Sequence, residues 1–177
     1  MSATTVSQIP AGTYAADPIH STIGFGVKYN GLATFRSTFE KFDAQLADGV
    51  LTGTADVTSV AIDEPNFKGH LMTEDFFNAE VTPTVTFRST AIRANDDGTA
   101  EVDGELTIKG VTKPVTATGS YAAGADPYGN ERVAFELSTT VDRREFGLNW
   151  QNALPNGGDA VAWDVTLTVD LQLVKQA

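Results

Sequence analysis

The chain has 177 residues, of which 41% are hydrophobic and 20% charged, and its formal net charge at pH 7 is −11. This length is enough for one domain with a sizeable core. The acidic balance argues against nucleic acid and anionic membrane surfaces as partners, because both require a basic patch. The absence of cysteine excludes disulfides, thiolate metal sites and thiol catalysis.

Residues 1–11 are expected to form a flexible N-terminal tail, and residues 12–177 a single domain. The start of the chain has neither a basic segment nor an apolar core typical of a secretory signal. We therefore expect a cytoplasmic location, and a periplasmic or secreted one only if a leader is missing. No stretch approaches the roughly 20 apolar residues of a membrane span, so stable membrane insertion is not expected.

The first third of the chain is typical of short β-strands. Apolar and polar residues alternate, and Asn30-Gly31 and Asp48-Gly49 are turn signals. The predicted strands cover 12–17, 23–29, part of 35–46, and 51–62.

The period changes between residues 65 and 79. Apolar residues four apart predict two short helices, and these pairs are Phe67 with Leu71 and Met72 with Phe76. Thr73, followed by two acidic residues, is predicted to cap the start of the second helix.

Strands resume after this helical insert, over 84–92, 100–109, 114–123, 132–142 and 161–173. The last is the most regular: every second residue from Val161 to Leu173 is apolar. At roughly 3.3 Å per residue it would extend about 43 Å, and a sheet of such strands must curve. The sequence predicts an all-β fold, an eight-stranded antiparallel up-and-down barrel of lipocalin-like type with a helical insert near 65–79.

The size of the inward-facing residues decides whether such a barrel is filled or hollow. Bulky and apolar residues are expected inside at Phe25, Val27, Phe42, Phe87, Leu106, Phe135 and Trp163. Small ones share these faces at Gly53, Ala55, Ser89, Ala91, Gly104, Ala117 and Gly119. Strand glycines also mark bulges, but seven small positions together favour a partly hollow interior. A narrow, deep tunnel suits a long alkyl or isoprenoid chain.

The apolar residues of the insert allow two interpretations. Phe67, Leu71, Met72, Phe76 and Phe77 could cap one barrel end as a mouth or lid, or they could pack as ordinary core. The sequence alone leaves both open.

The chain has two histidines, and neither predicts a catalytic centre. His20 and Ser21 are neighbours in a strand and point to opposite faces, so a triad with Asp17 is excluded. A hydrogen bond between His20 and Asp17 is expected instead. His70 has no second histidine nearby, so we expect it to satisfy rim or helix-end hydrogen bonds, with a ligand head-group contact, a metal site or acid–base chemistry as alternatives. No catalytic residue, metal or cofactor is predicted.

Several ordered motifs resemble the YceI-like family of lipid-binding proteins, from about Gly12 to Leu173. They are Asp17-Pro-Ile-His-Ser21, Phe39-Glu-Lys-Phe42, His70-Leu71, Asp75-Phe-Phe77, Pro83-Thr-Val-Thr-Phe87, Gly104–Pro114 and Arg143-Arg-Glu-Phe-Gly147. The chain departs from the family pattern at Tyr29, Ser37, Phe67-Lys68 and Glu145. The resemblance implies an extended lipocalin-type barrel without enzymatic activity that holds polyisoprenoids, isoprenoid quinones or fatty amides.

The leading hypothesis is therefore non-enzymatic binding, storage or transport of a long apolar ligand, a polyisoprenoid or similar lipid. Its rivals are an enzyme acting on a small amphiphile, with His70 or the Arg143–Glu145 region as its polar centre, and a filled barrel that works through surface contacts, for example as a homodimer. The predicted ligand-binding residues are Phe25, Val27, Phe42, His70, Leu71, Phe76, Phe77, Phe87, Leu106, Ala117, Gly119, Phe135 and Trp163.

Overall fold

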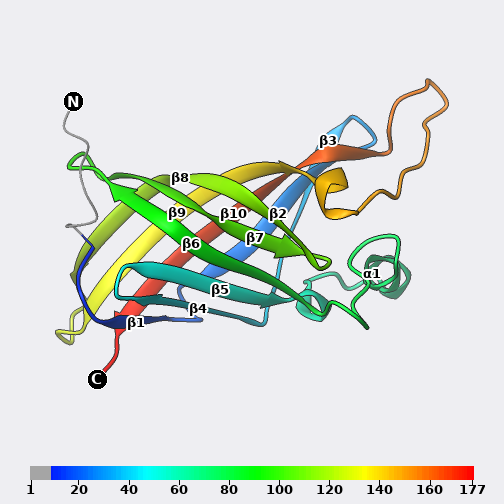
Figure 1. The fold of residues 1–177 in the computed structure, drawn as a ribbon. Helices are drawn as coiled ribbons and strands as arrows, with labels where there is room; N and C mark the ends of the chain where they lie inside the picture. Colours follow the sequence, from blue (N-terminus) through cyan, green and yellow to red (C-terminus); the bar gives the residue numbers. More distant parts are fainter. Residues whose placement is uncertain (1–8) are drawn as a thin grey trace.

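The computed structural model describes residues 9–177, so most of the predicted tail at 1–11 lies outside the described residues. Ten strands dominate the fold (Figure 1). They are β1 (Thr13–Ala16), β2 (Thr22–Tyr29), β3 (Ala33–Thr38), β4 (Phe42–Ala47), β5 (Val50–Asp56), β6 (Thr84–Ala94), β7 (Thr99–Ile108), β8 (Val111–Ala125), β9 (Glu131–Asp142) and β10 (Val161–Lys175). The helices are α1 (Pro65–Met72) and the 3₁₀ turns η2 (Val57–Ser59) and η3 (Arg143–Phe146).

The sheet closes on itself because β10 is long enough to pair with two strands in succession along one edge. Near its end β10 pairs with β1, and along most of its length it pairs with β2. β1 in turn pairs with β4, and β2 with β3. The ten strands thus fill eight positions of a closed antiparallel barrel, which confirms the predicted fold class.

Two predicted elements differ from the structure because local turns interrupt the alternating pattern. The segment 35–46 is divided into β3 and β4, and the strand predicted over 51–62 ends at Asp56. The Asp56 carboxylate accepts hydrogen bonds from the backbone N–H and the hydroxyl of Thr58, so it caps η2 and ends the strand.

The insert contains one α-helix where two were predicted. Thr73 ends α1 instead of starting a second helix: its backbone N–H and its hydroxyl both donate to the His70 carbonyl oxygen. The N-terminal cap is Glu64, whose carboxylate accepts from the Phe67 N–H. Tight turns that follow the helix, not helical periodicity, place Phe76 and Phe77.

The barrel interior is divided into two clusters. One end is tightly filled by side chains with almost no exposed surface, and we call it the filled half; its most buried members are Tyr14, Leu46, Val102, Val133, Phe135 and Leu173. The other end, the open half, is surrounded by a second cluster that includes α1, the turns after it and η3. In Figure 1, α1 and the β2–β3 turn lie at this end, and the C-terminus at the other.

Gly119 lies where the backbone of β9 comes very close to β8. A Cβ at this position would overlap the backbone carbonyl of Glu136. The two strands are paired from Thr118 to Ala125. Beyond Thr118, towards the open half, the Thr139 hydroxyl donates to the Thr116 carbonyl oxygen across the two strands. Gly119 is therefore a packing requirement of the barrel wall and contributes no space to the interior.

We predict that Gly119→Ala lowers the free energy of unfolding by about 3 kcal/mol, the upper range for overpacking, because a rigid backbone atom must move. The control is Gly124→Ala in the same strand, where a Cβ meets nothing within 4 Å. Urea denaturation of both variants checks this, and equal stability of the two would contradict the assignment.

Candidate functional site

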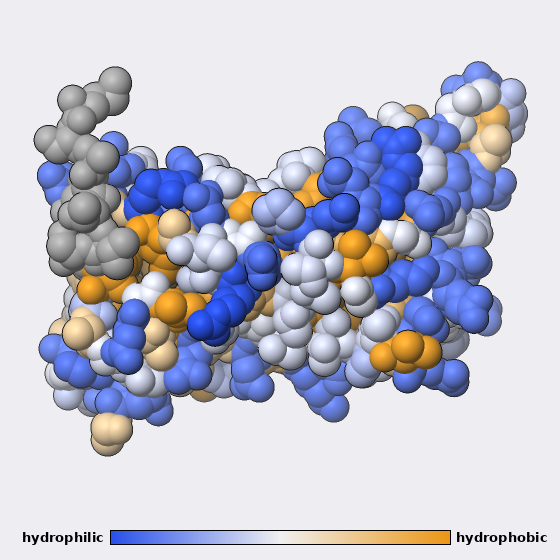
Figure 2. All heavy atoms as spheres, viewed as in Figure 1, coloured by the Kyte–Doolittle hydropathy of each residue, from blue (hydrophilic) through white to orange (hydrophobic). Residues whose placement is uncertain are grey.

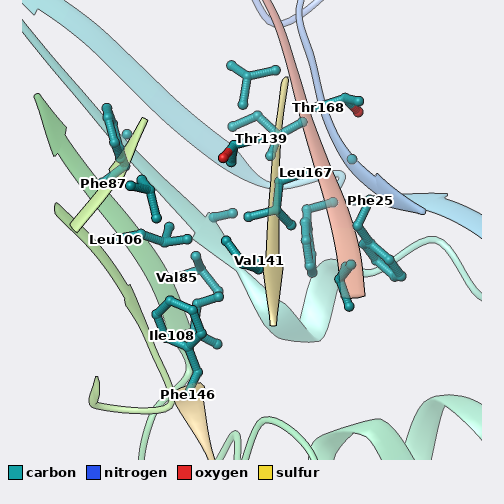
Figure 3. Close-up of a pocket in the computed structure, with 18 of the residues that line it drawn as sticks. Phe25, Val85, Phe87, Leu106, Ile108, Thr139, Val141, Phe146, Leu167 and Thr168 are labelled. Atoms are coloured by element: carbon teal, nitrogen blue, oxygen red, sulfur yellow. The ribbon is translucent and has the colours of Figure 1, made fainter. Parts of the chain in front are cut away.

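The open half of the barrel contains a cavity of ≈ 420 Å³. This volume lies within the range of small-molecule binding pockets. Side chains from opposite walls point into it, among them Phe25 of β2, Leu106 of β7, Val141 of β9 and Leu167 of β10 (Figure 3). Leu51 and Leu171, which belong to the filled half, also line the cavity and close its inner end.

The cavity wall is almost entirely apolar. Among the labelled side chains of Figure 3 only Thr139 and Thr168 carry an oxygen atom. Of the described residues that line the cavity, Arg143 is the one with a charged side chain. Such a wall excludes a strongly hydrated ligand, because a polar group buried there would lose its hydrogen bonds to water.

The entrance is bordered by aromatic side chains. Tyr29 and Phe67 line the cavity, yet 53% and 40% of their surface is exposed. The ring of Phe67 in α1 contacts the edge of Phe35 in β3, with 5.5 Å between centroids. Phe35 in turn contacts Phe25 at 6.2 Å. The half-exposed Tyr29 and Phe67 thus mark the end at which the cavity reaches the surface.

The insert forms part of the cavity wall, whichever of its two roles is considered. Phe67, Leu71, Phe76 and Phe77 line the cavity. Leu71 and Phe76 are also buried in the core cluster of the open half. These residues are thus packed as core and, at the same time, bound one end of the hollow.

Eight of the thirteen predicted ligand-binding residues line the cavity. These are Phe25, Val27, Leu71, Phe76, Phe77, Phe87, Leu106 and Ala117. The small residues Gly53 and Ala55 line the cavity as well, as the alternation of inward and outward positions along this strand indicated. Whether these residues bind a ligand stays a prediction.

Two predicted residues lie inside the barrel but away from the cavity. Phe135 is 0% exposed and packs in the filled half, since its position along β9 is nearer the closed end. Phe42 packs against the core of the open half without reaching the hollow. Gly119 does not line the cavity either, because the neighbouring strand occupies the place that a side chain would take.

Trp163 does not point into the cavity, because β10 is irregular at this position. The register between β10 and β2 shifts between Val161 and Val165, so simple alternation fails there. The Trp163 ring lies against the guanidinium groups of Arg143 and Arg144, at 4.3 and 4.6 Å from its centroid, and not in the cavity.

His70 does not line the cavity either. Its Nε2 is 2.8 Å from the Asp75 carboxylate, and its ring contacts the edges of Phe76 and Trp150. The histidine therefore joins the end of α1 to the turn that follows it and to the loop after η3. This is the hydrogen-bonding role expected for it at the barrel rim.

The segment around His20 forms a structural network at the filled end. His20 Nδ1 is 2.7 Å from the Asp17 carboxylate, which also accepts from Arg132 of β9 at 3.0 Å. Both partners lower the pKa of Asp17 far below its usual value. Ser21 instead hydrogen-bonds to the backbone of Gln172. His20 and Asp17 thus contact each other, as expected, and Ser21 takes no part in that contact.

Arg143 and Leu167 show what the site-residue prediction omitted. Leu167 and its neighbours Val165, Val169 and Leu171 line the cavity, and the alternation of the last strand was a signal for them. Arg143 was considered only within the polar centre of the rival enzyme, because it follows the end of β9 and the direction of its side chain is set by the turn η3.

Within residues 9–177, no three side chains of His, Cys, Asp or Glu gather closely enough to hold a metal ion. No helix in the same range has the length and hydropathy needed to cross a bilayer.

Comparison with known families gives a match over residues 14–173 to the model described as the YceI-like domain. A UPF0312 protein of Pseudomonas aeruginosa (strain LESB58) is 34% identical over 154 residues, covering 81% of this chain and 80% of the relative. A UPF0312 protein of Vibrio cholerae (strain El Tor Inaba N16961) is 30% identical over 162 residues, covering 84% and 86%.

Three solved structures share the fold. The YceI protein of Campylobacter jejuni superimposes with a TM-score of 0.71 at 20% identity, over 85% of this chain and 90% of that one. BcnA of Burkholderia cenocepacia gives 0.67 at 22%, over 91% and 99%. A polyisoprenoid binding domain from Saccharophagus degradans gives 0.69 at 12%, over 92% and 98%.

We predict that Gly53→Phe fills the hollow and reduces the affinity for an apolar fluorescent dye such as 1-anilinonaphthalene-8-sulfonate or Nile red by about tenfold or more. A Cβ at Gly53 meets only the Asp43 carbonyl oxygen, at 3.7 Å, so the new ring has room to enter the cavity. Gly124→Phe, which adds the same side chain outside the cavity, is the control. Dye titration of both folded variants measures the effect, and equal affinities would show that the dye binds elsewhere.

Proposed function

The chain belongs to the YceI-like domain family, and we propose that it binds one long-chain apolar ligand of the polyisoprenoid class in the open half of its barrel. The observation that carries this proposal is the cavity in the barrel, whose wall is almost entirely apolar. The solved domain from Saccharophagus degradans, named for polyisoprenoid binding, has the same fold and supports this ligand class.

The energetics of burial favour such a ligand without a large polar anchor. Each buried methylene contributes about 0.8 kcal/mol, so a chain of about fifteen carbons would gain roughly 12 kcal/mol. Loss of ligand freedom costs at least about 4 kcal/mol. The balance of roughly 8 kcal/mol corresponds to a dissociation constant of about 1 μM.

A carrier or storage role fits this site better than catalysis. His70 lies outside the cavity and is held by Asp75, and Arg143 is fixed in the cavity wall by three hydrogen bonds to backbone carbonyl groups. We propose that the ligand enters between α1 and the β2–β3 turn, past the contact of Phe67 with Phe35. In this account the protein acts by enclosing a chain and later releasing it.

The proposal predicts one-to-one complexes with linear prenols, detectable by native mass spectrometry of protein freed of lipid by organic extraction. Farnesol should bind at least about tenfold more tightly than geraniol, because each isoprene unit adds several buried carbons. Gly124→Phe should show the same preference for farnesol over geraniol as the wild type, and Gly53→Phe should lose this preference. The absence of any complex, or affinity independent of chain length, would contradict the proposal.

A further inference from the structure

Arg143 is a buried cation in the wall of an otherwise apolar lumen. Its residue surface is 4% exposed, and it lines the cavity. Nε donates to the carbonyl oxygen of Ala162 at 2.9 Å, Nη1 to Leu148 at 2.6 Å and Nη2 to Val161 at 3.2 Å. All three acceptors are neutral, so these bonds orient the guanidinium group without balancing its charge.

No carboxylate lies within ion-pair distance of Arg143 in the described part of the chain. The nearest acid in sequence, Asp142, is bound by Arg144 at 2.6 Å. Burial lowers the pKa of Arg143 from its ordinary value. The Trp163 ring at 4.3 Å offers partial compensation. The carboxylates of Asp142 and Asp159 attract the guanidinium group from beyond ion-pair distance and offset the effect of burial only in part, since the pKa stays lowered. A buried charge without an ion-pair partner is costly, which suggests that an anion in direct contact arrives with another molecule.

The guanidinium group also retains capacity to donate. It carries five N–H bonds, and three of them are used by the carbonyl oxygens of Ala162, Leu148 and Val161. The two remaining N–H bonds belong to Nη1 and Nη2, which is the pair of atoms that binds a planar oxyanion in bidentate contacts.

The position of Arg143 suits a head group near the entrance. Val161, which accepts from Arg143, pairs with the half-exposed Tyr29 at the rim. Leu51 and Leu171 close the opposite, inner end of the cavity. A ligand with its head at Arg143 would therefore direct its chain towards the filled half.

We propose that Arg143 binds the oxyanion head group of the ligand, so that the preferred ligand is a long apolar chain ending in a carboxylate or a phosphate. This inference rests on the proposed function and adds the chemistry of the polar end. A carboxylate and a phosphate present the same acceptor oxygens, and the experiment below distinguishes them.

The first test compares ligands of one chain length on the wild-type protein: palmitate, hexadecyl phosphate, methyl palmitate and hexadecylamine. We expect one of the two anions to bind about tenfold or more tightly than the ester, as a buried charge-assisted contact implies, and the amine to bind worst. Equal affinities for anions and ester would overturn this inference while leaving the proposed function intact. Failure of all four to bind would overturn the proposed function itself.

The second test removes the guanidinium group. Arg143→Gln should reduce the affinity for the preferred anion to that for the ester and leave the ester unchanged. The control is Gln151→Ala: Gln151 also binds the backbone of Val161, through Nε2 and Oε1, but does not line the cavity. It should keep the preference for the anion. Loss of preference in Gln151→Ala alone would overturn the assignment to Arg143.

In Arg143→Gln three backbone carbonyl groups lose their donor, so a measurement on the wild type covers the case in which this variant does not fold. The carboxyl carbon of bound ¹³C-palmitate is titrated by NMR. Contact with Arg143 should lower the pKa of the carboxyl group below that of the free acid, whereas burial against apolar side chains alone would raise it. A raised pKa would overturn the inference.

Discussion

The closure of the barrel by β10 is the constraint on which the rest of the structure depends. This strand pairs with β9 along one edge, and with β1 and then β2 along the other. Its inward side chains run from Leu173 in the filled half to Val165 and Leu167 in the cavity wall. A single alternating strand thus crosses both halves of the interior and fixes which residues face the hollow.

The hollow arises from the distribution of small residues, not from their number. Gly53, Ala55 and Ala117 leave space because nothing from the opposite wall reaches them. Gly104 and Gly119 are equally small, but the Phe87 ring and the Glu136 backbone occupy the positions their Cβ atoms would take. Gly104 and Gly119 therefore tighten the barrel, whereas Gly53, Ala55 and Ala117 widen it. On the face that Figure 2 shows, the outer surface is a mixture of polar and apolar residues.

Sequence reasoning predicted the barrel because alternation with period two is a local property that each strand carries by itself. It also identified which side chains point inward, as Leu106 and Ala117 illustrate. It could not predict how far along the barrel axis each side chain lies. Phe135 and Leu106 both point inward, but Phe135 lies in the filled half and Leu106 lines the cavity. Three further features depend on neighbouring strands. They are the register shift near Trp163, the close approach of β9 to Gly119, and the turn that buries Arg143. These three features are tertiary, and no spacing in the chain encodes them.

The most direct test of a hollow open half beside a filled half is to locate the bound chain. NOEs between a ¹³C-labelled prenol and the protein should involve the methyl groups of Leu106, Val141 and Leu167, and should be absent from those of Leu46 and Val133. NOEs confined to residues of the outer surface, or the absence of any to the three lining residues in a saturated complex, would contradict the account.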